Sequence, residues 1–206
     1  MKSKFIPFVI LTVLIMGCAK VYYSPDARSL AGAHKLIAVV PPKVSIAPSK
    51  KVDAESLKEQ QKTESLNFQK EIYSWLLKRK MQNKIFVEIQ DVETTNAKLI
   101  KAGANDNTAV DPSEMCEILG VDAIVTSNFS LSKPMSDGGA IALGLLVGVW
   151  GASNTATGTV GAFDNKTDKT IWNYSGKLSG TVGSSPAQLI DNMMRYASKS
   201  MPYVVN

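Results

Sequence analysis

Histidine and cysteine are the scarcest reactive side chains in this sequence. The 206 residues contain one histidine, His34, and two cysteines, Cys18 and Cys116. His34 and Cys116 would form a thiol–imidazole couple if the fold brought them together. However, Cys116 lies between Met115 and Ile118 in a helical pattern, where a small buried thiol is the usual outcome, and His34 precedes the first predicted strand. The sequence therefore predicts no catalytic residue and no enzyme.

Metal sites also lack their ligand patterns. One histidine and one free thiol offer no zinc spacing, and the segment DNKTDK, residues 164–169, lacks the glycine and distal glutamate of a calcium loop. The nearest carboxylate pairs, Asp106 with Asp111 and Asp164 with Asp168, are expected to be solvated turn formers. We predict no metal site and no cofactor.

The N-terminus has the architecture of a secretory signal. Two lysines precede an apolar run that closes on Gly17 and Cys18, and Ile15 stands three residues before the cysteine. This pattern resembles the lipobox of bacterial lipoproteins, which implies cleavage after residue 17 and acylation of Cys18 by palmitate-type chains. Two or three such chains anchor a protein stably to a membrane. We predict a signal peptide over residues 1–17 and a lipidated tether over residues 18–33.

The residues after the cysteine predict where the anchor goes. Ala19 and Lys20 follow Cys18, so no acidic residue is present to retain the protein in an inner membrane. Assuming a Gram-negative source, we predict the periplasmic face of the outer membrane. Removing the first 17 of 206 residues leaves 189, enough for one domain, which we place at residues 34–206. The net charge of +5 includes two lysines of the signal and is too small for a nucleic-acid partner.

Hydrophobic periodicity predicts an α/β fold, a mixed sheet with flanking helices in a single domain. Strands are predicted at Leu36–Val40, at 85–90 and from Val121, and a β-hairpin joins 155–163 to 170–180 around DNKTDK. Helices are predicted at Asp53–Lys80, between the capping Asp111 and Gly120, and at Pro186–Met201. Spacings of three and four residues place Phe68, Ile72, Trp75, Leu76 and Arg79 on one face of the first helix, and Leu189, Met193, Tyr196 and Ala197 on one face of the last.

A glycine-rich stretch of 14 residues, 139–152, interrupts this pattern. It lacks the lysine of a phosphate loop, and as a helix it would span about 21 Å, short of the ~30 Å hydrocarbon core. Ala140, Gly144, Gly148 and Ala152 recur every four residues, which gives a flat face for close approach of another backbone. The helix would pack on its own sheet, on a second copy or partner, or shallowly on a membrane through Trp150; an irregular loop is the remaining alternative. We predict a packing or docking element with Ala140, Gly144, Gly148 and Trp150 as contact residues.

Several short motifs together resemble one group of bacterial lipoproteins. They are LIAVVPP, ILGVDAIVTSNF, FDNKTDKTIWNYSG and the closing MPY, spread over Leu36 to Tyr203. They resemble the TolB N-terminal-like group, which includes the curli-secretion lipoprotein CsgG. The resemblance implies a mixed sheet with packed helices and no catalytic residues. CsgG forms a pore from long strands with an apolar outward face, which 155–163 and 170–180 lack, so a non-pore relative is predicted.

These observations lead to one functional hypothesis and two alternatives. The hypothesis is a membrane-anchored periplasmic lipoprotein, non-enzymatic, that acts in envelope assembly, scaffolding or secretion through contacts with envelope proteins or with itself. One alternative is an oligomeric export channel like CsgG. The other is a module that binds a small ligand in a cleft between the sheet and the helix at Asp53–Lys80.

Overall fold

A computed structural model of the chain describes residues 19–48, 53–104, 110–132, 155–179 and 185–205. In these ranges a seven-stranded sheet is combined with helices. The strands are β1 (Lys20–Tyr23), β2 (Leu36–Val39), β3 (Lys43–Ile46), β4 (Glu88–Ile89), β5 (Ala123–Leu131), β6 (Thr155–Asp164) and β7 (Lys169–Ser179). The helices are α1 (Ala27–Ala33), α2 (Ala54–Met81), α3 (Val92–Lys101), α4 (Pro112–Leu119) and α6 (Pro186–Ala197).

The sheet is mixed, which confirms the predicted α/β class. Its strand order is β1-β7-β6-β5-β2-β4, and β3 also pairs with β5. The pairs β5–β6, β6–β7 and β7–β1 are antiparallel. β2 and β3 each pair with β5 in parallel, and β4 pairs with β2 in parallel. The predicted hairpin is the β6–β7 pair. The proline pair Pro41-Pro42 ends β2 as expected, and the chain then resumes as β3 further along β5.

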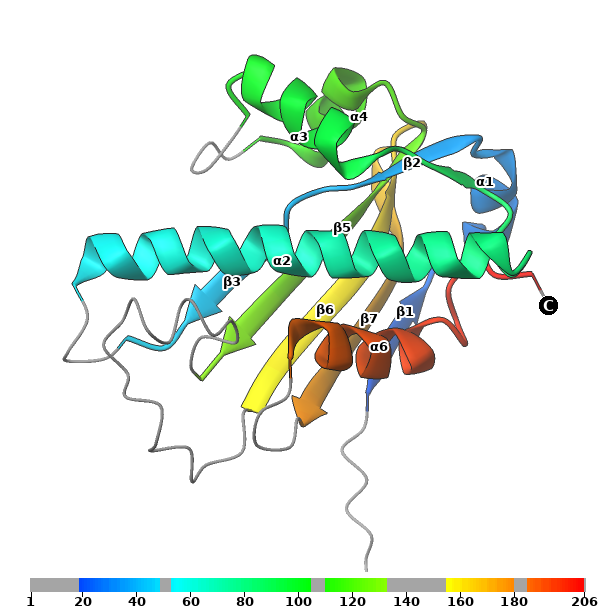
Figure 1. Cartoon of the computed structure of the whole chain (residues 1–206). Helices are drawn as coiled ribbons and strands as arrows, with labels where there is room; N and C mark the ends of the chain where they lie inside the picture. Colours follow the sequence, from blue (N-terminus) through cyan, green and yellow to red (C-terminus); the bar gives the residue numbers. More distant parts are fainter. Residues whose placement is uncertain (1–18, 49–52, 105–109, 133–154, 180–184, 206) are drawn as a thin grey trace, which may run out of the picture.

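Alternate residues of the central strands enter two separate cores. Val125 and Phe129 of β5 face the larger core under α2 and α6, and Ile124 faces a smaller core formed with α4. Successive side chains of a strand point to opposite faces, so the two groups of helices must cover opposite faces of the sheet. Figure 1 shows α2 and α6 side by side across the strands, with α3 and α4 gathered at one end.

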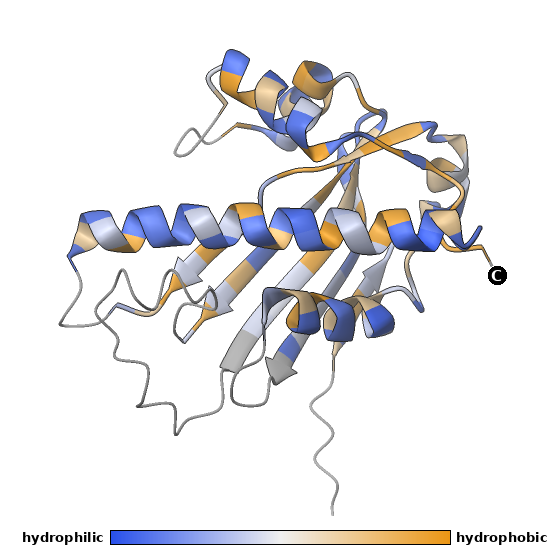
Figure 2. Ribbon diagram, in the orientation of Figure 1, coloured by the Kyte–Doolittle hydropathy of each residue, from blue (hydrophilic) through white to orange (hydrophobic). Residues whose placement is uncertain are grey.

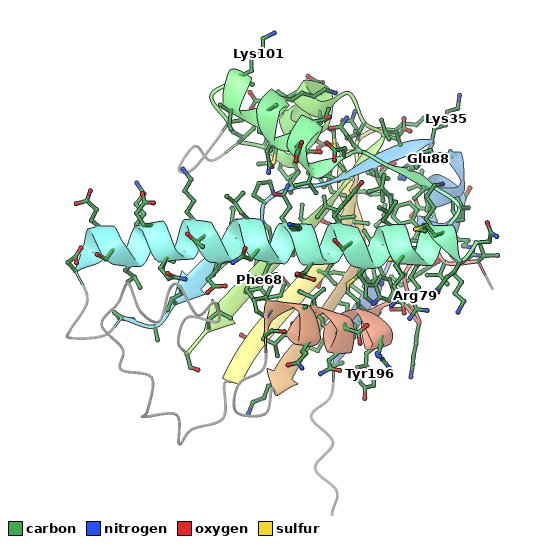
Figure 3. All side chains as sticks on the ribbon, in the orientation of Figure 1. Lys35, Phe68, Arg79, Glu88, Lys101 and Tyr196 are labelled. Carbon is green, nitrogen blue, oxygen red and sulfur yellow. The ribbon has the colours of Figure 1, made fainter. Side chains whose placement is uncertain are left out.

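The long helix α2 follows the predicted boundaries. Asp53 accepts a hydrogen bond from the backbone nitrogen of Ser56 and caps the helix, as predicted. Its first turns are mostly polar, and apolar positions become frequent in the second half (Figure 2). Phe68 points from α2 towards the sheet (Figure 3) and stacks on Phe129, with ring centroids 4.3 Å apart. The predicted apolar positions Phe68, Ile72, Trp75 and Leu76 are all buried, and Arg79 lies over the Trp75 ring.

Residues 20–33, predicted to be a tether, are instead part of the fold. β1 pairs antiparallel with β7, with Tyr22 opposite Asn173, and extends the sheet at its edge. The helix α1 then buries Ala27 and Ala31 in the larger core. The prediction failed because all four β1 side chains are exposed, so the strand is held by backbone pairing and shows no alternation of apolar residues.

Other predicted elements needed smaller corrections. In the predicted strand at 85–90, only Glu88–Ile89 forms the ladder of β4, and Ile85 makes an isolated bridge to Val204. The helix α3 was not predicted. In α6, Leu189, Met193 and Ala197 are buried as predicted, but Tyr196 is 62% exposed and projects away from the sheet (Figure 3). Tyr196 therefore lies outside the buried face of α6.

Replacing Phe68 by alanine tests the packing of α2 on the sheet. We expect Phe68→Ala to lower the free energy of unfolding by about 3–5 kcal/mol, because a fully buried ring stacked on Phe129 is removed. Leu66→Ala is the matched control in the same helix, since Leu66 is 43% exposed, and it should change stability by less than about 0.5 kcal/mol. Urea unfolding measures both; equal losses for the two variants would contradict this packing.

Candidate functional site

The five residues predicted for anchoring and contact lie outside the described part of the chain. They are Cys18, Ala140, Gly144, Gly148 and Trp150. The described residues nevertheless place the ends of both segments. Ala19 directly precedes β1, and the 139–152 stretch falls between the end of β5 and the start of β6. Residues 131 and 156 are paired neighbours at that end of the sheet.

His34, which precedes the first predicted strand, lies in a buried hydrogen-bond network. It ends α1, is 8% exposed, and joins two residues that are far apart in the sequence. Its Nε2 lies 2.6 Å from Oδ1 of Asp164, at the end of β6, and its Nδ1 lies 2.9 Å from the hydroxyl of Tyr203 near the C-terminus. The network connects α1, the β6–β7 hairpin and the C-terminal segment.

The protonation of this network follows from its geometry. Burial acts to raise the pKa of Asp164, but hydrogen bonds from Thr167 and His34 outweigh it and hold the pKa below its ordinary value. An ionised Asp164 only accepts, so Nε2–H of His34 donates to it. The Nδ1 of His34 is hydrogen-bonded to the hydroxyl of Tyr203, whose pKa is raised by burial. Asp164, expected to be a solvated turn former, is thus 1% exposed and ionised within the core.

This arrangement rules out the His34–Cys116 couple. Both ring nitrogens of His34 are bonded to other side chains. Cys116 lies in the smaller core with Leu119 and Ile124, and burial raises the pKa of its thiol to about 12, with Asp164 and Asp122 adding to the rise. A thiolate at Cys116 is therefore negligible at neutral pH. The predicted role of Cys116 as a small buried side chain is confirmed.

A pocket of about 290 Å³ opens beside the buried network. It is lined by Ser29, Leu30, Ala33, His34, Asp122, Asp164, Asn165 and Lys166. Its carboxylates are already committed to the fold. Oδ2 of Asp122 accepts hydrogen bonds from the backbone nitrogens of Lys35 and Leu36, at 2.7 and 3.0 Å, and so fixes the start of β2. These contacts outweigh the effect of burial and lower the pKa of Asp122.

The ligand cleft predicted between the sheet and α2 is filled by side chains. Phe68, Ile72 and Leu76 of α2 are fully buried against strand residues such as Val39 and Phe129. Among the described residues, no cluster of three or more histidine, cysteine, aspartate or glutamate side chains is placed to hold a metal ion. None of the described helices is both long enough and apolar enough to cross a membrane.

The charge on Asp164 should make stability depend on pH. The folded pKa of Asp164 lies below its ordinary 3.8, so its contribution is complete above that pH and is lost as the pH falls from 3.8 towards the folded value. We expect Asp164→Asn to cost roughly 1.5–3 kcal/mol at pH 7, because charged hydrogen bonds to His34 and Thr167 are lost, and to cost less near pH 3.

Asp168→Asn is the matched control for this experiment. Asp168 is exposed in the same turn, and asparagine tolerates its φ of 54°. Urea unfolding of both variants at the two pH values is the measurement. A cost for Asp164→Asn that is the same at pH 7 and pH 3 would contradict an ionised Asp164 in the folded protein.

The sequence is similar to no family model and to no curated protein. Solved structures with a similar course of the chain exist at low sequence identity. The PelC dodecamer from Paraburkholderia phytofirmans is 10% identical with a TM-score of 0.43, covering 93% of this chain and 99% of that chain. Lipoprotein GNA1162 from Neisseria meningitidis is 14% identical with a TM-score of 0.45, covering 80% and 96%. The LpoB C-terminal domain from Salmonella enterica is 12% identical with a TM-score of 0.33, covering 75% and 95%.

Proposed function

We propose that the chain is a lipid-anchored protein of a bacterial envelope that acts through protein contacts in envelope assembly, scaffolding or secretion. The observation that carries this proposal is the short distance in sequence between the predicted lipidation site, Cys18, and the first strand of the fold, β1. Cys18 stands at the end of a lipobox-like sequence, and β1 begins at Lys20. Acyl chains on Cys18 would therefore attach the folded domain itself to a bilayer.

The finer assignment keeps the sequence predictions. Ala19 and Lys20 after the cysteine favour the periplasmic face of the outer membrane of a Gram-negative cell. Within the TolB N-terminal-like group, the chain would be a relative that forms no pore. The closed arrangement around His34 is consistent with a role in contacts, because the polar atoms of His34, Asp164 and Tyr203 are bonded to one another.

The proposed contact element is the glycine-rich stretch between β5 and β6. Its Ala140, Gly144 and Gly148 would present the flat face, with Trp150 beside it. Both strands that flank the stretch are anchored in the middle of the sheet, with β5 paired to β2, β3 and β6. A contact made there by a second copy or an envelope protein would thus be transmitted to the rigid part of the domain.

Cys18→Ser tests the anchor. We expect wild-type cells to incorporate labelled palmitate into the protein and the Cys18→Ser variant to incorporate none, because the only acceptor sulfur at the lipobox is removed. The variant should also keep its 17-residue signal, which mass spectrometry of the purified protein detects. Cys116→Ala is the control and should be labelled like the wild type, since Cys116 is buried in the core. Unchanged processing of Cys18→Ser would refute the anchor.

Replacing Gly144 and Gly148 together by leucine tests the contact role. The added side chains would fill the flat face and block close approach of another backbone. We expect the mass of the complex in native extracts to fall and co-purifying proteins to be lost, as measured by light scattering and by crosslinking with mass spectrometry. Leu146→Met is the control in the same stretch. A folded double variant in unchanged complexes would exclude these glycines from the contact.

A further inference from the structure

Half of one sheet face is not covered by any described helix. On the side opposite α2 and α6, Ile124 of β5 and Phe163 of β6 lie in the smaller core with α4. Further along β5 the same side carries Thr126, Asn128 and Ser130, of which the last two are exposed. Because side chains alternate along a strand, the register extends this polar half-face across five strands. Its residues, which we call the open face, are Lys20, Tyr22, Lys43, Ser45, Thr126, Asn128, Ser130, Thr157, Thr159, Asn173, Ser175 and Lys177.

The open face is built in straight rows across the sheet. One row runs through paired residues from Lys43 on β3 to Asn128, Thr159, Ser175 and finally Lys20 on β1. Nδ2 of Asn128 donates a hydrogen bond to Oγ1 of Thr159 at 3.2 Å, which joins two strands of the row. Strands lie about 4.8 Å apart, so the two lysines at the ends of this row are about 19 Å apart.

The charge of the open face has one sign. Lys20, Lys43 and Lys177 are its charged members, and it contains no aspartate or glutamate. All three lysines are exposed, and none makes an ion pair with a described residue. The remaining members carry hydroxyl, amide or phenol groups. Such a surface complements an extended anionic surface that also accepts hydrogen bonds.

The short connection to Cys18 determines which anionic surface lies nearest. Lys20 is the second residue after Cys18, and extended chain spans at most about 3.6 Å per residue. The start of β1 would thus lie within about 7 Å of the acylated residue. With so short a connection to an acylated Cys18, the domain would stay close to the bilayer.

We propose that the open face lies on an anionic phospholipid surface, with its lysines against the headgroups and Tyr22 at the interface. This inference rests on the proposed acylation of Cys18. Lysines near such a surface are attracted to it, and tyrosine is enriched at membrane interfaces. Tyr22 is 53% exposed, follows Lys20 on the same side of β1, and lies opposite Asn173.

Lysine acylation by a water-soluble reagent on vesicles tests the proposal. The processed, lipidated protein is placed on vesicles that contain phosphatidylglycerol or on vesicles of phosphatidylcholine alone, and labelling is followed by mass spectrometry. Lys43 is the decisive residue, because a domain that only hung from Cys18 would protect Lys20 at most. We expect Lys43 and Lys177 to react at least about fivefold more slowly on the anionic vesicles. Lys101, which projects from the end of α3 (Figure 3), should react equally on both.

A change of salt concentration tests whether the protection of Lys43 from acylation is electrostatic in origin. Raising the salt from about 0.1 M to about 1 M shortens the Debye length from about 10 Å to about 3 Å. Protection of Lys43 should then disappear while the protein still floats with the vesicles. Failure to float at low salt would refute the anchor itself. Flotation with Lys43 equally reactive on both vesicle types would refute only the docking of the open face.

A charge variant with a thiol reporter gives an independent test. Ser130→Cys places a reactive thiol within the open face, since Cys116 is buried and Cys18 would be acylated. On anionic vesicles the thiol should be protected from a maleimide, and protection should be lost when Lys43 and Lys177 are both changed to Gln. The matched pair Lys84→Gln and Lys101→Gln should leave it protected. Protection already present in detergent, together with a dimer mass by light scattering, would assign the face to a second copy and overturn the proposal.

Discussion

The architecture depends on the central strand β5, which pairs with other strands along both edges and sends side chains into a core on each face of the sheet. One edge pairs with β6 along nine residues, and the other receives β2 and then β3 in succession. Its alternate side chains must enter different cores, since a pleated strand directs neighbours to opposite faces. Val125 and Phe129 therefore pack under α2 and α6, and Ile124 packs under α4. Where the second core ends, the same alternation exposes Asn128 and Ser130, so one constraint produces both a buried centre and a polar outer surface.

The ends of the fold are held by a second, polar constraint. The carboxylate of Asp164 orients His34, and the other ring nitrogen of His34 is hydrogen-bonded to the hydroxyl of Tyr203. Three segments separated by 130 and 169 residues are thereby fixed at one point. Buried polar groups are costly unless all are paired, and here the ionised carboxylate is also satisfied by Thr167. His34, Asp164 and Tyr203 would look reactive if taken by themselves, but here they hold three distant segments of the chain together.

The short chain between Cys18 and β1 shapes the proposed function. A lipoprotein domain on a long tether can meet partners away from the membrane, whereas this domain begins two residues after Cys18. If Cys18 is acylated as proposed, the orientation of the sheet relative to the bilayer would be set by β1 and its neighbours. The glycine-rich stretch between β5 and β6 would be presented in a defined direction for the same reason.

The local sequence determined the elements whose signals lie within a few residues. Asp53 caps α2, Asp111 and Gly120 bound α4, and the polar turn at 164–168 joins β6 to β7, because capping and turn chemistry act over one to four residues. The apolar face of α2 and the α/β class followed from periodicity in the same way. Only the tertiary structure decided the rest. The strand β1 has no apolar side to reveal it, and the pairing of His34 with Asp164 and Tyr203 joins positions whose proximity depends on the whole sheet. The open face likewise exists only through the register of five strands, which no single stretch of residues encodes.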